Sequence, residues 1–166
     1  MTLVRTFVTG YFRDVRGTAT QVLALLMAVW FTSNGPVALA MNPDFSMHPM
    51  HSHTVHVLGF IPVTVNGWHA LFHFVTGVAG LLCVRTKAVA VRYAAVTALI
   101  YLAVGVLGLA SGTSVCGMMA VDTFGNWVHV VEGVILVGIA ASGVVGKREP
   151  DSIRPSVISG AGGVAS

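Results

Sequence analysis

The sequence predicts an all-α fold, a polytopic membrane four-helix bundle with both termini in the cytoplasm and an amphipathic interfacial helix at the N-terminus. Apolar residues make up 55% of the 166 residues and charged residues only 9%, whereas soluble domains carry about 25% charged residues. So few charges cannot cover the surface of a soluble protein of this size. The composition therefore excludes a water-soluble enzyme, and the lack of a basic cluster in the sequence excludes a nucleic-acid binder.

Four apolar stretches supply the predicted membrane spans. They run over about residues 18–33, 68–84, 93–110 and 124–145. The first stretch is the shortest, because a helix needs roughly 17–25 residues to cross the hydrocarbon core. We expect it to end at the helix-breaking run Ser33-Asn34-Gly35-Pro36. The chain is therefore divided into an interfacial helix (1–17), a four-span bundle (18–145) with an outer loop (34–66), and a cytoplasmic tail (146–166).

The distribution of charge predicts the orientation of these spans. All nine basic residues and three of the six acidic residues lie on one side of the predicted membrane, giving a net charge of +6, and the other side carries three acidic residues, or −3. The basic residues are Arg5, Arg13, Arg16, Arg85, Lys87, Arg92, Lys147, Arg148 and Arg154. Because short cytoplasmic segments are enriched in Lys and Arg, both termini are predicted to be cytoplasmic.

The first 17 residues place their apolar side chains on one helical stripe and their arginines off it. The stripe comprises Leu3, Val4, Phe7, Val8, Tyr11, Phe12 and Val15. This pattern predicts an anchor helix lying on the cytoplasmic leaflet. The alternative is that the segment extends the first span.

An internal repeat relates the second and fourth spans. Both contain His-x-x-x-Gly, as His73/Gly77 and His129/Gly133, and the fourth span adds Asn126 where the second has Ala70. With the Gly-Phe-Ile-Pro run at 59–62, the region from about 59 to 145 resembles a bacterial family of four-helix membrane proteins, mostly from high-GC Gram-positive bacteria. That family is classified only as a domain of unknown function. The resemblance implies four spans in a bacterial plasma membrane and no activity.

The predicted outer loop contains a dense set of imidazole and thioether groups. The residues are Met47, His48, Met50, His51, His53 and His56. Imidazole binds copper, zinc, iron and nickel, and thioether favours Cu(I), so these residues are a candidate copper site. A polar loop without a ligand and a pH-responsive loop are the alternatives.

Ionisable residues within the predicted spans form a second candidate site. His69 and His73 share one face of the second span, and His129 and Glu132 share one face of the fourth. Such residues in a membrane mark a functional site by default. Three interpretations remain open: hydrogen bonds between helices, a metal or proton site between His73, His129 and Glu132, and haem ligated by His73 and His129.

A further outer segment contains Cys116, Met118, Met119 and Asp122, which are candidates to join the loop ligands. Cys83 is predicted at the opposite side of the membrane, so it cannot form a disulfide with Cys116. The sequence contains no phosphate-binding loop and no nucleophile–base motif. We therefore expect no catalytic residues and no enzyme activity of the chain by itself.

These features predict an accessory subunit of a larger bacterial membrane complex, such as a metallo- or redox enzyme. Abundant glycine favours close packing between helices, within the chain or against neighbouring subunits. The expected partners are other membrane subunits and the lipid bilayer. Two alternatives are a copper-binding or copper-delivery protein that uses the outer loop, and a haem-bearing membrane protein.

Overall fold

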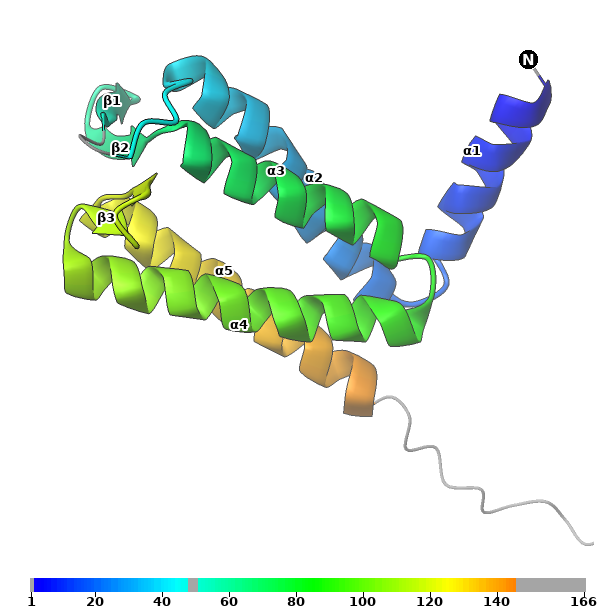
Figure 1. The fold of residues 1–166 in the computed structure, drawn as a ribbon. Coiled ribbons are helices and arrows are strands. Elements are labelled where there is room, and N and C mark those ends of the chain that lie inside the picture. The colour runs from blue at the N-terminus through cyan, green and yellow to red at the C-terminus, as the bar shows by residue number, and fades with distance from the viewer. Residues whose placement is uncertain (1, 48–50, 146–166) are drawn as a thin grey trace, which may run out of the picture.

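A computed structural model describes residues 2–47 and 51–145, so the predicted tail (146–166) lies outside the described residues. The described chain is mostly helical, with two short antiparallel hairpins at one end of the helices, which we call the hairpin end (Figure 1). The helices are α1 (Thr2–Val15), α2 (Ala19–Met41), α3 (Gly67–Cys83), α4 (Lys87–Ser111) and α5 (Thr123–Val145). The strands are β1 (His53–Val57), β2 (Ile61–Val65), β3 (Ser114–Val115) and β4 (Met119–Ala120).

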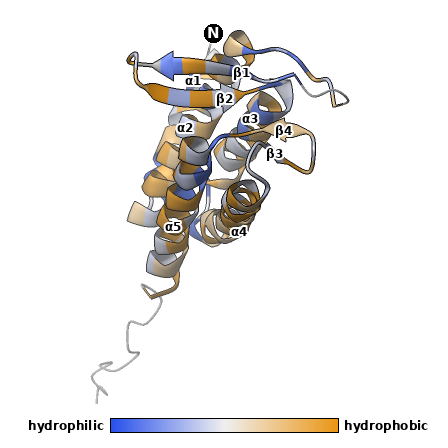
Figure 2. Cartoon of the chain, turned by 90° about the vertical axis from the view of Figure 1, so that its left-hand side faces the viewer, coloured by the Kyte–Doolittle hydropathy of each residue, from blue (hydrophilic) through white to orange (hydrophobic). Residues whose placement is uncertain are grey.

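Three helices, α2, α4 and α5, are long and apolar enough to cross a membrane. Helix α3 is also apolar but has 17 residues. Hydrophobic residues predominate along α4 and α5 (Figure 2). Large apolar side chains on these helices, such as Leu99 and Val134, are exposed. An apolar outer surface of this kind fits a lipid bilayer rather than water.

The helices associate as two close pairs, α2 with α3 and α4 with α5, and the pairs pack on each other. Gly77 of α3 lies directly against Thr32 of α2, and Gly108 of α4 lies against Asn126 of α5. A side chain at either glycine would collide with the partner helix. The pairs are held together by a buried core that includes Phe31.

Helix α2 continues to Met41, so the prediction that this span ends at Ser33 is wrong. Pro36 lies inside the helix, and Gly35 packs against α3 at Ala70 and Phe74. Helices in membranes tolerate Pro and Gly because neighbouring helices support the interrupted backbone. The connection to α3 therefore begins at Asn42 rather than at residue 34.

The connection between α2 and α3 contains the β1–β2 hairpin, and the connection between α4 and α5 contains the β3–β4 hairpin. The prediction of an all-α chain missed both. His53 pairs with Val65 and Val57 with Ile61 in the first hairpin. The hairpins are joined because the Thr64 backbone N–H donates to the carboxylate of Asp122. Together they cover the ends of the helices (Figure 1).

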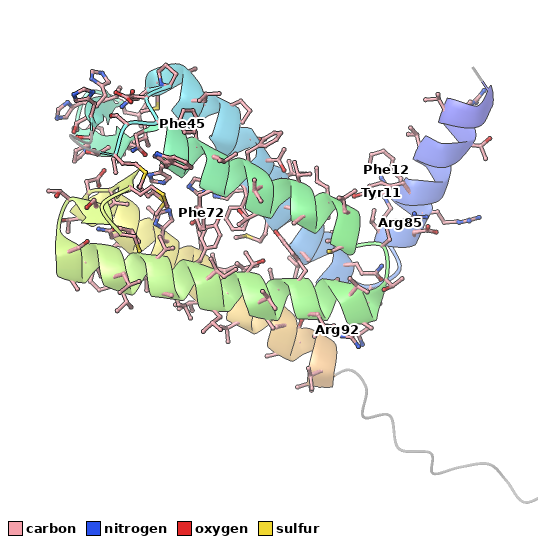
Figure 3. The ribbon with its side chains drawn as sticks, viewed as in Figure 1. Tyr11, Phe12, Phe45, Phe72, Arg85 and Arg92 are labelled. Atoms are coloured by element: carbon pink, nitrogen blue, oxygen red, sulfur yellow. The ribbon has the colours of Figure 1, made fainter. Side chains whose placement is uncertain are left out.

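Helix α1 leans away from the other helices at the end opposite the hairpins (Figure 1). The Tyr11 hydroxyl donates to the Leu81 carbonyl at 2.7 Å, and Arg85 forms a 2.9 Å ion pair with Asp14. Arg85 and Arg92 mark this end of the molecule (Figure 3). The buried amide of Gln21 donates to backbone carbonyls of both helix junctions, which ties α1 to the loop after α3.

Candidate functional site

Three buried histidines converge between the two helix pairs, just beneath the hairpins. His69 and His73 come from α3 and His129 from α5, and each is at most 6% exposed. The Nε2 atom of His73 lies 3.2 Å from Nε2 of His69 and 3.5 Å from Nε2 of His129. One ligand nitrogen from each residue lies within 4.8 Å of the others. We call this group the histidine cluster.

The start of α3 positions the first two members of the cluster. Asn66 is the N-cap of α3, and its side-chain oxygen accepts from the backbone N–H of His69 at 3.1 Å. The same oxygen accepts from the N–H of Ala120, and the Asn66 amide donates to the Met118 carbonyl. His73 follows one helical turn after His69, so both rings point to the same side. One buried asparagine thus fixes the helix, the β3–β4 hairpin and the cluster together.

Hydrogen bonding sets the tautomer of His69. Its Nδ1 atom lies 2.8 Å from the backbone carbonyl of Ala120. A carbonyl only accepts, so Nδ1 carries the proton in the neutral ring and Nε2 carries a lone pair. His69 therefore presents a bare nitrogen to the cluster.

A chain of hydroxyl groups contacts His73. The Thr76 hydroxyl lies within hydrogen-bond distance of the Phe72 and His73 carbonyls and, at 2.9 Å, of the Tyr101 hydroxyl. The Tyr101 oxygen lies 3.1 Å from Nδ1 of His73, and either group can be the donor. When Nδ1 donates, Nε2 of His73 carries a lone pair; when Tyr101 donates, Nε2 carries the proton and can donate to Nε2 of His69 at 3.2 Å. A metal ion at the cluster requires the first of these tautomers.

Aromatic rings surround the cluster. Phe31 stacks on Tyr101 with their ring centroids 4.3 Å apart, and Tyr101 contacts both His73 and His129. Phe72 points into the space between α3 and α4 and packs against the same two histidines (Figure 3). This packing keeps water away from the imidazoles and holds their rings in place.

The family model for a domain of unknown function, DUF4383, matches residues 21–142. The chain belongs to this family. Neither the curated proteins nor the solved structures contained a match. The matched part of the DUF4383 chain includes the histidine cluster and both hairpins, and it leaves out α1.

Glu132 lies apart from the ligand nitrogens of the cluster. It is 5% exposed, and its Oε1 atom accepts from the indole Nε1 of Trp30 at 2.6 Å. Its other oxygen, Oε2, has no hydrogen-bond partner among the described residues. The structure thus groups His73 and His129 with His69, whereas Glu132 of α5 lies beside Trp30 of α2.

The loop ligands of the DUF4383 chain do not assemble in the described residues. His51 bonds to the Asp44 carboxylate at 2.8 Å, and hydrogen bonds from Ser46 hold the pKa of that carboxyl below its usual value. His53 and His56 are exposed on β1, where their odd spacing directs them to opposite faces. Met47 is exposed, and His48 and Met50 lie outside the described residues.

The second set of outer ligands is also dispersed. Cys116 is exposed at the β3–β4 turn, and both it and Cys83 are free thiols. Met119 is buried in an apolar cluster. Asp122 is occupied by hydrogen bonds, since it accepts from the backbone N–H groups of Thr64 and Gly125.

The two helix pairs of the DUF4383 chain are structural repeats. Gly35 of α2 packs on Ala70 of α3, and Gly105 of α4 packs on Asn126 of α5. Each pair is joined by a hairpin, so the order helix–hairpin–helix occurs twice. The repeats run in the same direction, which relates them by an axis along the helices, as in parallel-repeat membrane proteins.

Repeat-equivalent residues meet at this axis. Gly77 packs against α2 in the first repeat, and Gly133 packs against α4 at the corresponding place in the second. His73 and His129 each precede these glycines by four residues, so the two histidines are equivalent. The departure at Ala70 also has a structural reason. In the first repeat, Ala70 packs beside Ala38. At the equivalent contact of the second repeat, Asn126 packs against Gly108. The larger side chain of Asn126 is thus accommodated because its partner is glycine rather than alanine.

Sequence reasoning placed His69, His73, His129 and Glu132 in one candidate site, but it grouped Glu132 rather than His69 with His73 and His129 as the metal or proton site. The structure brings His69 to the other two histidines. The i, i+4 spacing of His69 and His73 was the available signal. Sequence reasoning missed the groups that support the cluster. The roles of the Ala120 carbonyl and the Tyr101 hydroxyl had no local signal, because both come from distant segments.

Proposed function

We propose that this protein is a membrane protein that binds one transition-metal ion, of the zinc class, at the histidine cluster. The observation that supports it is the convergence of three buried ligand nitrogens, with Nε2 of His73 3.2 Å from Nε2 of His69 and 3.5 Å from Nε2 of His129. The tautomer of His69 directs a lone pair to this point, and His73 does the same when its Nδ1 donates to Tyr101. A cation held there would use all three nitrogens.

The distances fit a tetrahedral ion. Zn–N bonds of about 2.0–2.1 Å in a tetrahedral site place neighbouring ligand nitrogens roughly 3.3 Å apart. The observed separations of 3.2 and 3.5 Å lie on either side of that value. The Ala120 carbonyl beside Nδ1 of His69 and the Tyr101 hydroxyl beside Nδ1 of His73 are of the kind of outer-shell partner that orients metal-bound imidazoles.

Three protein ligands leave one coordination position for water or another small ligand. Zinc sites with three protein ligands are of the catalytic type, in which the ion acts as a Lewis acid. The described side chains favour a compact ion over haem, because His69, Phe72 and Tyr101 pack against the two rings that would ligate haem iron.

The membrane placement that accompanies this function is also a proposal. We propose four spans, α2 to α5, in a bacterial plasma membrane, with both termini cytoplasmic and α1 lying on the cytoplasmic leaflet. Arg85 and Arg92 at the end opposite the hairpins support this orientation (Figure 3). Exposed Val4 and Phe12 on α1 support its contact with lipid. The histidine cluster then lies in the outer half of the bilayer.

Metal binding is tested on the full chain purified in detergent, treated with chelator and titrated with Zn²⁺. We expect one ion per chain. Co²⁺ should give the visible absorption of a tetrahedral nitrogen site. His73→Ala removes the central ligand and should abolish stoichiometric binding, because the two remaining nitrogens cannot hold the ion alone.

The matched control is His53→Ala, which removes an exposed imidazole from β1 and should leave the stoichiometry at one. Chain integrity is checked by thermal unfolding of both variants. Metal-free wild-type protein that binds no Zn²⁺ or Co²⁺ would refute the proposal. Equal loss of binding in His53→Ala would instead assign the ion to the outer loop, as the copper alternative predicts.

The accessory-subunit role is retained as a second proposal. The exposed apolar faces of α4 and α5 and the surface of the hairpins are surfaces that another membrane subunit can cover. Affinity purification in mild detergent, followed by identification of the proteins bound, tests this role. A stoichiometric membrane subunit supports it, and purification of the chain alone under conditions that preserve other complexes contradicts it.

A further inference from the structure

An apolar groove opens between α2 and α5, and none of the cluster histidines lines it. It has a volume of about 490 Å³ and is lined by Met27, Trp30, Trp127, Val131, Glu132 and Ile135. The two indoles are about half exposed. The volume is that of a site for a small organic molecule. We call this feature the Glu132 groove.

The base of this groove contains an incompletely bonded carboxyl group. Trp30 donates to Oε1 of Glu132, but Oε2 has no partner among the described residues. The residue is only 5% exposed, so Oε2 is buried. A buried polar atom without a hydrogen bond costs about 1–3 kcal/mol. A ligand in the groove can supply the missing bond.

The other repeat provides an internal comparison. A second groove between α3 and α4 is lined by Trp68, Leu71, Phe72 and Val75. There Thr76 occupies the position of Glu132, since each precedes the close-packed glycine of its helix. The Thr76 hydroxyl is fully bonded within the protein. The fold thus accommodates at this position a residue whose hydrogen bonds are all made within the protein. The Glu132 groove differs because Oε2 of its carboxyl group has no partner among the described residues.

Depth limits the chemistry of the ligand. Glu132 is nine residues from the start of α5 at Thr123, which places it about 14 Å along the helix, close to half the thickness of the hydrocarbon core. A phospholipid headgroup cannot be placed there without great cost, and the basic residues of the chain are at the opposite end. The ligand must therefore be lipid-soluble, with a small, uncharged polar group.

We propose that the Glu132 groove binds a lipid-soluble phenol of the quinol class. A hydroxyl both donates and accepts, so it can bond to Oε2 whether the carboxyl group is ionised or protonated. Exposed Trp30 and Trp127 line the groove, and the planar ring of a phenol can stack on an indole there. The apolar substituent then follows Val131 and Ile135 towards the lipid.

The test uses decyl-1,4-benzohydroquinone and its dimethyl ether, which lacks both hydroxyl donors. Binding is followed by quenching of tryptophan fluorescence in lipid nanodiscs under anaerobic conditions. The Trp68→Phe background leaves fluorescence only from Trp30 and Trp127, because the chain has three tryptophans. We expect saturable quenching by the hydroquinone and about tenfold or weaker binding of the ether, the effect of losing a hydrogen bond to a buried carboxyl group.

Glu132→Thr copies the residue of the equivalent groove and should weaken hydroquinone binding by about tenfold or more. It should leave binding of the ether unchanged. Val75→Ala, on the α3–α4 side, is the matched control and should change neither. Equal affinity for hydroquinone and ether in the wild-type groove would overturn the proposal without any variant. Repeating the titration after chelation separates it from metal binding, since the groove does not include the cluster nitrogens.

Discussion

At the scale of single residues, the Tyr101 hydroxyl is the hydrogen-bond partner of Nδ1 of His73, at 3.1 Å. We expect it to accept from Nδ1 when the cluster holds an ion, because Nε2 of His73 must then carry a lone pair. Phenylalanine at position 101 would remove that acceptor. Metal affinity should therefore depend on a side chain that makes no contact with the ion itself.

We predict that Tyr101→Phe weakens Zn²⁺ binding roughly 10–100-fold, as other losses of an outer-shell partner do. Competition with a chromophoric chelator measures the affinity. Tyr93→Phe is the control, because the Tyr93 hydroxyl donates to the backbone carbonyl of Thr76 and does not contact a histidine. If both variants bind zinc equally, the Tyr101 hydroxyl does not set the tautomer.

At the scale of elements, glycine sets the distance within each helix pair, and asparagine joins the helices to the hairpins. Gly108 has no room for a methyl group because Asn126 occupies the space above it. A Cβ atom added at Gly138 of α5 would meet nothing within 4 Å. Gly108 is therefore needed for helix packing and Gly138 is not, a difference that the sequence around the two glycines does not reveal.

Gly108→Ala is expected to lower the free energy of unfolding by about 1–3 kcal/mol, the usual cost of overpacking. Gly138→Ala should be neutral or stabilising, because alanine is the better helix former. Thermal unfolding in one detergent compares the two. A stable Gly108→Ala variant would show that α4 and α5 can separate without loss.

Asn66 connects three elements, and we predict that Asn66→Ala destabilises the protein and also weakens zinc binding. It removes the N-cap bond to His69 and both bonds to the β3–β4 hairpin, including the one that holds Ala120 over His69. Thr86→Ala removes only the N-cap of α4 at the opposite end, with a cost of about 1 kcal/mol. The control should lose stability while its zinc affinity, measured by the same chelator competition, is unchanged.

At the scale of the whole molecule, two helix–hairpin–helix repeats meet face to face and place equivalent residues on both sides of one axis. His73 faces His129, and Phe31 stacks on Tyr101. The symmetry is incomplete at the positions that carry chemistry. His69 has no histidine counterpart, and Glu132 replaces Thr76. The second repeat therefore carries Glu132, whose Oε2 atom has no partner among the described residues. The first repeat supplies two of the three histidines of the cluster.

The proposed orientation predicts opposite labelling of the two cysteines. In Cys83→Ala protein, an impermeant maleimide added to intact cells should label Cys116, which is exposed at the hairpin end. In Cys116→Ala protein, Cys83 should react only after permeabilisation, because it lies at the other end of α3. Labelling of Cys83 from outside would invert the topology, and labelling of both would exclude α3 as a span.

The sequence by itself determined the class of the protein and the approximate positions of its apolar helices. Hydrophobic length and composition are local properties, so Lys87–Ser111 and Thr123–Val145 were predictable from windows of sequence. The boundary of α2 was not, because Pro36 is helical only with α3 packed beside Gly35. The same holds for the hairpins, whose ends are joined through Thr64 and Asp122 from separate connections.

The candidate site divides in the same way. The spacing of His69 and His73 predicted two imidazoles on one helix face, and the repeated His-x-x-x-Gly pattern identified His129 as the counterpart of His73. Only the tertiary structure decided that all three meet, that the Ala120 carbonyl sets the tautomer of His69, that Tyr101 contacts His73, and that Glu132 faces a groove with Trp30. Convergence of side chains depends on how two helix pairs pack across an axis, and that relation is a property of the folded chain.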